Sequence, residues 1–182
     1  MIEKYNKRRL SKKMIKIEYG NKNIMFIIDI DEERQVIDNK VLESIWSDDF
    51  YLDDNKNEMY LENSGAEVYG KYVVCWAYIA QGQGGIVFVW DTDKKEVVHY
   101  SNGEFVVKAC LHDNKIYTLR LVSYWGVKTH LEIDYCEFGT KSEDNEGIEV
   151  MTEIKMSNSA YNSDNYLFEF DSDGAVSIRT VE

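Results

Sequence analysis

The sequence of 182 residues contains no proline and only three cysteines. Average usage of roughly 5% would give about nine prolines, and the sequence offers no physical reason for their absence. The cysteines, Cys75, Cys110 and Cys136, are odd in number, widely spaced and without a CxxC pair. This pattern argues against a disulfide framework and against a zinc ribbon. A reducing cytoplasm is therefore the predicted compartment.

Long apolar segments are also missing. The longest uninterrupted apolar run, YVVCWAYIA at 72–80, has nine residues. A membrane-spanning helix needs about 20. The basic N-terminus is followed by MIKIEYG at 14–20, without the apolar core or the small-residue cleavage site of a signal peptide. We therefore expect neither secretion nor membrane insertion.

The familiar catalytic signatures are absent as well. The sequence has no GxSxG elbow, HExxH helix or glycine-rich dinucleotide fingerprint. QGQGG at 81–85 lacks the Lys and Ser/Thr of a phosphate-binding loop and leads straight into a strand-like run, so we interpret it as a turn. DSDG at 171–174 and DDNKNE at 53–58 begin like calcium loops but do not reach a Glu at the twelfth position. We expect no tuned metal site and no cofactor.

The composition is that of one ordered globular domain, with 44% hydrophobic and 13% aromatic residues. The net charge of −12 is unevenly distributed, because residues 1–16 carry seven cations and one acidic residue, a net of +6. We predict a basic N-terminal arm over 1–16, whose order the sequence leaves open, and a single all-β domain over 17–182. An acidic body repels phosphates, so direct nucleic-acid binding is not expected.

Alternation of apolar and polar residues with a period of two is the main structural signal. LEIDYCEF at 131–138 alternates in this way and predicts a half-buried strand. The continuously apolar runs at 72–80 and 86–90 predict central strands covered on both faces. The same criteria predict three more strands, at 148–156, 166–170 and 175–181.

Five stretches place an Asp and a second turn-forming residue between apolar residues. They are 36–42, 52–61, 90–98, 111–119 and 170–178. Asp and Asn tolerate left-handed backbone angles, so each stretch is a candidate hairpin turn. The sequence thus predicts an all-β fold, an antiparallel meander of roughly 10–12 strands in a sandwich or open barrel with at most one short helix. A propeller-like stack of small sheets is the alternative.

Residues 31–46 allow two interpretations. Apolar residues recur every four positions from Ile37 to Ile45, behind Asp31 as a candidate helix N-cap. The same stretch fits a hairpin through Asp-Asn-Lys at 38–40. We favour the hairpin, because this tripeptide recurs elsewhere in the chain.

Cys110 and His112 would share one face of a strand, as half of a metal site or as a thiolate–imidazole pair. No second close pair completes such a site, and a cysteine acting as a small hydrophobe beside an ordinary histidine is the simpler interpretation. Asp134 and Cys136 also share a face and could meet the first pair only if their strands were neighbours. An enzyme site assembled from distant strands, with Cys110, His112 and an Asp, is therefore kept as one hypothesis.

Acidic residues are concentrated in the first third of the chain. Between residues 29 and 67, 13 acidic residues face three basic ones, a local net charge of −10. A solvated face is the simpler interpretation. Interleaved aromatic residues, however, offer the anchors found at interface centres, and the spaced carboxylates can stand in for phosphates. The predicted partner-binding residues are Trp46, Asp48, Asp49, Phe50, Tyr51, Asp53, Asp54, Glu58 and Glu62.

These features favour a non-catalytic acidic protein that binds a basic protein partner. Most concretely, we expect an inhibitor that occludes a nucleic-acid-binding enzyme, in the manner of a toxin-immunity protein or a phage anti-defence (anti-CRISPR) protein. The alternative is a β module that stacks a sugar or another small ligand on aromatic residues, for instance Trp76, Trp90 and Trp125. The sequence leaves the identity of the partner and the oligomeric state open.

Overall fold

The computed structural model of the protein is mostly β-sheet, which confirms the predicted all-β, antiparallel fold class. It describes residues 13–20, 23–30, 33–45, 61–79, 84–103, 105–124, 127–142, 150–152 and 162–181. Within them the chain forms sheets of three, five, four and two strands, called A, B, C and D below. One short α-helix accompanies sheet A, as the predicted fold allowed.

Sheets A and B are formed mainly by the first half of the chain. Sheet A comprises β1 (Lys13–Gly20), β2 (Asn23–Ile30) and β3 (Glu33–Ile37), followed by helix α1 (Asn39–Glu43). Sheet B comprises β4 (Leu61–Tyr69), β5 (Tyr72–Ile79), β6 (Gly85–Asp91), β7 (Glu96–Gly103) and β11 (Lys141–Ser142). The strand orders are β1-β2-β3 and β11-β7-β6-β5-β4. Within sheet A and within sheet B from β4 to β7, consecutive strands pair antiparallel. The short β11 pairs with β7 in parallel.

Sheets C and D follow in the second half. Sheet C comprises β8 (Val106–His112), β9 (Lys115–Tyr124), β10 (Val127–Glu137) and β12 (Val150–Thr152). Sheet D comprises β13 (Tyr166–Phe170) and β14 (Val176–Thr180), after the 3-10 turn η2 (Ser163–Asn165). The order in sheet C is β12-β10-β9-β8, and β13 pairs with β14. The strand predicted at 166–170 is thus confirmed residue for residue.

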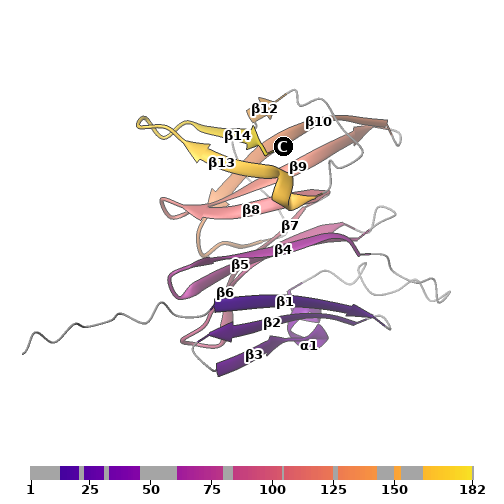
Figure 1. Ribbon diagram of the computed structural model, residues 1–182, viewed down its shortest axis with the longest axis vertical. Coiled ribbons are helices and arrows are strands. Elements are labelled where there is room, and N and C mark those ends of the chain that lie inside the picture. Colours follow the sequence, from indigo (N-terminus) through magenta and orange to yellow (C-terminus); the bar gives the residue numbers. More distant parts are fainter. Residues whose placement is uncertain are drawn as a thin grey trace, which may run out of the picture.

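The four sheets are stacked in the order A, B, C, D, so the sandwich has more than two layers (Figure 1). Each of the three spaces between sheets is filled by one cluster of buried apolar side chains. Burial of each Val, Leu, Ile or Phe side chain in these clusters contributes about 1.5–3 kcal/mol to stability. The propeller-like alternative also predicted small meander sheets. A propeller arranges its sheets around a central channel, however, whereas sheets A and D lie at opposite ends of the stack (Figure 1).

Strands β5 and β6 of sheet B are covered on both faces, as their continuously apolar sequences predict. Along β5, Val73 and Cys75 pack into the layer shared with sheet A. Their neighbours Val74 and Trp76 pack into the layer shared with sheet C. Since successive side chains of a strand point to opposite faces, a strand between two apolar layers has no solvated face. Every residue of β6 is buried for the same reason, including Asp91 at its end.

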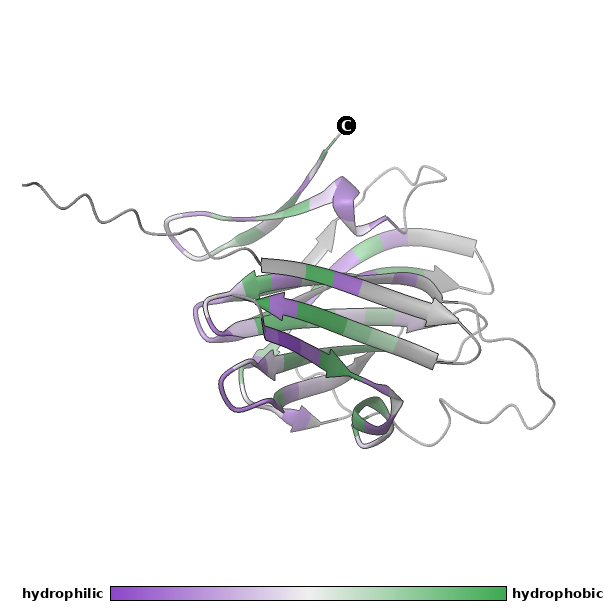
Figure 2. Cartoon of the chain, turned by 60° about the horizontal axis from the view of Figure 1, so that its bottom comes forward, coloured by the Kyte–Doolittle hydropathy of each residue, from purple (hydrophilic) through white to green (hydrophobic). Residues whose placement is uncertain are grey.

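Hydropathy along the ribbon follows this layering (Figure 2). Hydrophobic residues lie along the strands, and hydrophilic residues gather in the turns at one end of the sheets. The turn between β8 and β9 consists of Asp113 and Asn114, whose φ angles are 45° and 61°. A two-residue hairpin turn with both residues left-handed suits the twist of the flanking strands. The Asp-Asn-Lys stretch at 111–119 is therefore a hairpin turn, as predicted.

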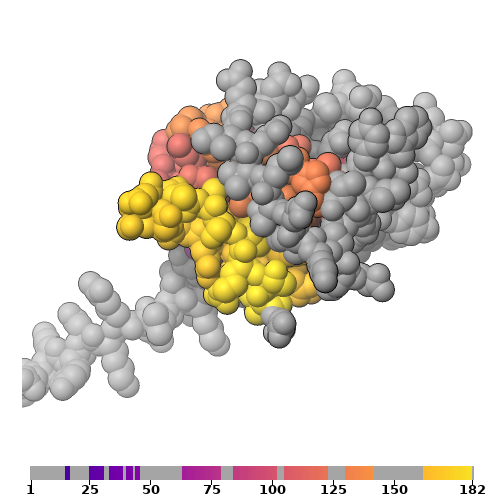
Figure 3. All heavy atoms as spheres, turned by 90° about the horizontal axis from the view of Figure 1, so that it is seen from above, coloured from indigo at the N-terminus to yellow at the C-terminus, as the bar shows by residue number. Residues whose placement is uncertain are grey.

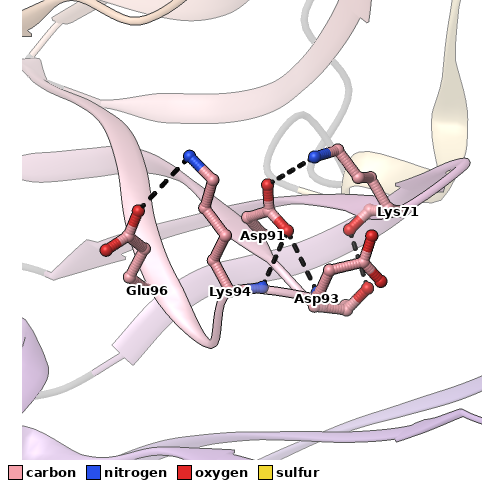
Figure 4. A network of polar contacts seen from close by, with 6 residues as sticks. Lys71, Asp91, Asp93, Lys94 and Glu96 are labelled. Atoms are coloured by element: carbon pink, nitrogen blue, oxygen red, sulfur yellow. Dashed lines mark hydrogen bonds and ion pairs between the residues drawn. The ribbon is translucent and has the colours of Figure 1, made fainter.

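The turn between β6 and β7 is organised by the buried Asp91 (Figure 4). Its Oδ1 accepts hydrogen bonds from the backbone N–H groups of Asp93 (3.0 Å) and Lys94 (3.1 Å), and its Oδ2 lies 2.9 Å from Lys71 Nζ. Burial opposes ionisation of this carboxyl, but the bonds from Lys71 and the backbone outweigh it and lower the pKa of Asp91. Lys71 lies in the turn between β4 and β5, so the two turns are held together.

The hairpin favoured at 36–42 is wrong. Asp38 is the N-cap of α1, and its side chain accepts hydrogen bonds from the backbone N–H groups of Lys40 (3.1 Å) and Val41 (3.3 Å). The same side-chain chemistry that forms Asx turns here begins a helix, because the helix places Leu42 in the apolar layer between sheets A and B. The longer helix behind Asp31 is also wrong, since β3 pairs with β2.

Other boundaries differ by a few residues. Strand β1 begins at Lys13, inside the segment 1–16 that its charge set apart. The turn predicted at 52–61 lies outside the described residues, except for Leu61. In the part of the chain that the structure describes, no helix is long and apolar enough to cross a membrane.

Candidate functional site

The acidic site predicted from the sequence falls almost entirely outside the described residues. This applies to Trp46, Asp48, Asp49, Phe50, Tyr51, Asp53, Asp54 and Glu58. Glu62 lies in β4, where only its backbone is described. The acidic site therefore stays a prediction.

The two ends of the acidic segment are placed by the fold. On one side, Ile45 is buried beside α1 in the layer between sheets A and B. On the other side, the buried Asn63 of β4 donates Nδ2 hydrogen bonds to the carbonyl oxygens of Val106 (3.0 Å) and Val107 (2.6 Å). Residues 46–60 thus connect two positions that are fixed by packing and by hydrogen bonds to sheet C.

Most of the described carboxylates of the region 29–67 already have a partner within the protein. Asp38 caps α1. Glu33 forms an ion pair with Lys95, with 2.5 Å between Oε1 and Nζ. Glu67 forms an ion pair with Lys108, with 2.7 Å between Oε1 and Nζ. These three therefore add little to any acidic surface made by the segment 46–62.

The aromatic surface proposed around Trp76, Trp90 and Trp125 is not formed by the first two. Trp90 is buried between sheets A and B, and its Nε1 donates a 2.6 Å hydrogen bond to Oε1 of Gln35. Trp76 is buried on the opposite face of sheet B, between sheets B and C. Trp125 lies outside the described residues. The two described rings are therefore core residues on opposite faces, and neither can stack on a sugar.

Cys110 and His112 do share one side of β8, and both line a cavity at that strand. They do not meet the second pair, because β9 lies between β8 and β10 and because Cys136 packs into the layer between sheets B and C. Burial, followed by the charge of Glu67, raises the pKa of the Cys110 thiol. A neutral thiol is a poor nucleophile, so this geometry does not support a catalytic thiolate.

A different cysteine–histidine contact was missed by the sequence analysis. Cys136 Sγ of β10 lies 3.6 Å from His99 Nε2 of β7, across the layer between sheets B and C. His99 is fully buried, and this burial lowers its pKa to about 4. Burial raises the pKa of Cys136 to about 11. Both groups are therefore neutral near pH 7, and the contact is not an activated thiolate–imidazolium pair.

The layer between sheets B and C contains several other buried polar groups. Asp134 of β10 forms an ion pair with Arg120 of β9, and Arg120 also approaches Glu132 at 3.7 Å. Among the described residues, Nε1 of Trp76 and Nδ1 of His99 have no hydrogen-bond partner. The alternation at 131–138 placed Asp134 on a solvated face, and the structure instead buries it against the Arg120 cation.

No group of three or more His, Cys, Asp or Glu side chains in the described ranges could hold a metal ion. The carboxylate of Asp171, which begins the calcium-like DSDG stretch, caps its own turn. Its Oδ1 accepts hydrogen bonds from the backbone N–H groups of Asp173 (2.9 Å) and Ala175 (2.8 Å). The Asp171 carboxylate thus has a structural role, like that of Asp91.

A cavity of about 240 Å³ lies between β4, β8 and β13. We call it the β4–β8–β13 pocket. Its polar end is formed by Glu67, Tyr69 and Lys108. Glu67 binds the Lys108 ammonium through Oε1 (2.7 Å) and accepts a hydrogen bond from the Tyr69 hydroxyl through Oε2 (2.6 Å). Burial and the adjacent Glu67 raise the pKa of Tyr69, which keeps its hydroxyl as a hydrogen-bond donor.

The other end of the pocket is apolar and aromatic. The His112 ring stacks on Phe170 with 3.7 Å between ring centroids and 12° between ring planes. Leu111 and Phe168 also line this end, and Leu167 at the rim is 36% exposed. Figure 3 shows the hairpin β13–β14 (yellow) on the outer surface beside residues of sheet C. The pocket is therefore closed on one side by the C-terminal hairpin.

The three cysteine side chains are buried, which predicts slow alkylation. For Cys136, a pKa of about 11 in place of 9.0 lowers the thiolate fraction at neutral pH about a hundredfold. We expect Cys75, Cys110 and Cys136 to react with iodoacetamide at least about tenfold more slowly in the folded protein than in urea. Mass spectrometry of the labelled peptides measures each site. A Cys110 that reacts faster than the unfolded chain would restore the enzyme hypothesis.

Comparison of the sequence with protein-family models and with curated proteins finds no match.

Proposed function

We propose that the protein is a non-catalytic, acidic, cytoplasmic protein that binds a basic protein partner and inhibits a nucleic-acid-handling enzyme. The inhibitor is of the kind represented by toxin-immunity proteins and phage anti-defence proteins. The observation that carries it is the charge of the segment 47–62, where six acidic residues face Lys56 alone, a net of −5. Carboxylates at such density attract a groove that normally binds phosphates.

The ion pairs of the fold support this proposal by limiting where the counter-charge can come from. Six described cations are already paired with carboxylates elsewhere: Lys71, Lys94, Lys95, Lys108, Arg120 and Arg179. These six cations are therefore less available to the segment 47–62, and counter-charge can come from the basic N-terminal residues or from a partner. In the first case, the arm competes with the partner for the same carboxylates.

Charge reversal tests the proposal. The variant with Asp48, Asp49, Asp53 and Asp54 all changed to Lys should keep the circular dichroism of the parent protein and lose complex formation. The partner is first captured from a lysate of the source cell on the immobilised protein, and binding of the purified partner is then measured. Binding should also weaken markedly from low to high salt, because exposed charge pairs are screened.

A matched control separates local from global electrostatics. The variant with Asp93, Glu137, Asp164 and Asp173 changed to Lys alters the net charge equally, at exposed positions of turns and a strand end. It should retain the complex. If both variants bind as the parent protein does, or both fail equally, the segment 47–62 is not the binding surface.

A further inference from the structure

The β4–β8–β13 pocket has the features of a ligand site, independently of the acidic segment. It combines one charged polar end with an aromatic end, the usual composition of small-molecule sites. Its volume of about 240 Å³ lies below the roughly 300–1,000 Å³ of pockets for drug-sized ligands. That space suits a single-ring compound, whereas a nucleotide or an oligosaccharide is larger.

The buried ammonium of Lys108 defines what the polar end can recognise. The Lys108 side chain is only 7% exposed, and removing an ammonium from water is costly unless its hydrogen bonds are made. An ammonium has three N–H donors, and among the described residues Glu67 is the only ion-pair partner of Lys108. Both oxygens of Glu67 are in use, one by Lys108 and one by Tyr69. Lys108 therefore keeps N–H donors that can bind a ligand.

The charge balance of the pocket selects against an anionic ligand. Glu67 already neutralises Lys108, and Asp113 lies 3.4 Å from the His112 ring at the pocket's other end. The whole protein carries a net charge of −12. A carboxylate or phosphate would add negative charge beside Glu67, and the described residues that line the pocket include no second Lys or Arg to balance it. An uncharged carbonyl oxygen is therefore the better acceptor for Lys108.

The aromatic end selects the shape of the ligand. The stacked rings of His112 and Phe170 and the ring of Phe168 offer flat surfaces, and flat rings gain most from such contacts. The rim is open, since Glu67 and His112 are each 38% exposed. A planar ring can therefore enter beside the hairpin β13–β14 with its polar group directed toward Lys108.

We propose that the β4–β8–β13 pocket binds a small, planar, uncharged ring compound through a carbonyl group that accepts hydrogen bonds from Lys108. Ring amides and nucleobase-like heterocycles belong to this class. The ring lies against the aromatic residues of β13, and the carbonyl oxygen lies at the Lys108 ammonium. The interaction is non-covalent, so no bond is made or broken.

The test uses three probes with the full-length protein: benzamide, benzoate and cyclohexanecarboxamide. Benzoate replaces the neutral amide by a carboxylate, and cyclohexanecarboxamide keeps the amide but has no flat ring. Residue-resolved NMR titrations report both the affinity and the position of binding on the parent protein. Benzamide should give saturable shifts at β4, β8 and β13, with at least about tenfold weaker binding for each of the other two probes.

Two variants test the roles of the residues. Lys108→Met removes the donor but keeps much of the side-chain volume, and it should weaken benzamide binding about tenfold or more. Phe168→Leu removes one ring at a partly exposed position and should weaken benzamide more than cyclohexanecarboxamide. The proposal is overturned if benzamide gives no saturable shifts at the pocket up to its solubility limit. It is also overturned if benzoate binds more tightly, if the shifts lie elsewhere, or if a folded Lys108→Met binds unchanged.

Discussion

Replacing Gly65 by alanine should destabilise the protein by about 3 kcal/mol, through overpacking of the layer between sheets B and C. A Cβ at this position would lie 2.2 Å from Cζ2 and 2.5 Å from Cε2 of Trp76. Such distances are far inside van der Waals contact, so either the indole or strand β4 must move. Gly65 has no positive φ, which makes its role purely one of space for the ring.

Trp76 has little freedom to yield. The ring is 2% exposed and packs with Val74, Val87 and Val106 in the same apolar layer. Close-packed interiors have few voids larger than a water molecule, so a displaced indole must push other side chains out of their rotamers. The strain therefore spreads into both sheets instead of being relieved locally.

Chemical denaturation and thermal unfolding measure this effect, with an expected fall in the melting midpoint of about 10 °C. Gly70→Ala is the control, because Gly70 has φ +63° and no atom within 4 Å of an added Cβ. It should cost only about 1 kcal/mol of backbone strain. In a Trp76→Phe background, which lacks the atoms that clash, the cost of Gly65→Ala should nearly disappear. An unchanged cost in that background would disprove the steric explanation.

Acidification should remove about 3 kcal/mol of stability through His99 between pH 6.5 and about 4. The imidazole is fully buried and neutral in the folded protein, and burial lowers its pKa from 6.5 to about 4. In this window the unfolded chain binds a proton that the folded protein excludes, so stability falls as pH falls. Each pKa unit corresponds to about 1.4 kcal/mol. Above pH 6.5 the contribution is complete, and below pH 4 the loss levels off because both states are protonated.

Carboxylates also titrate in this range, so the effect of His99 must be isolated by comparison. Urea unfolding of the parent protein and of His99→Gln at several pH values gives the required difference. The unfolding free energy of the parent minus that of His99→Gln should fall by about 3 kcal/mol from pH 7 to pH 4. Ser101→Ala changes a buried residue on the same face of β7 but keeps the imidazole. The stability of this variant should show the same pH dependence as that of the parent. Parallel curves for the parent and His99→Gln would show that His99 does not titrate as described.

The parts of the fold that the sequence predicted are those with a local cause. Continuous apolar runs at 72–80 and 86–90 leave no solvated face, so their place between two layers follows directly. The turn residues Asp113 and Asn114 need no distant partner, because the turn geometry depends on their own backbone angles. Asp38 shows the limit of such reasoning, since one side-chain preference serves both an Asx turn and a helix N-cap.

The β4–β8–β13 pocket illustrates what the sequence could not show. A period of two placed Cys110 and His112 on one face, and the structure brings both into the pocket. Lys108, however, lies in an apolar strand whose sequence gives no hint of its ion-pair partner. That partner, Glu67, is 41 residues earlier on another sheet. Which residues of two stacked sheets come into contact is decided by the packing of the whole stack. No short window of sequence predicts such contacts.

Strand β11 has a consequence for the order in which the molecule can be completed. After the chain has formed β8, β9 and β10, it returns to sheet B, where Lys141 and Ser142 pair in parallel with Tyr100 and Ser101. Until then the outer edge of β7 presents unpaired backbone groups, the kind of edge on which chains aggregate. A nascent chain that stops short of residue 141 therefore leaves Tyr100 and Ser101 at this edge without the partner strand that β11 supplies.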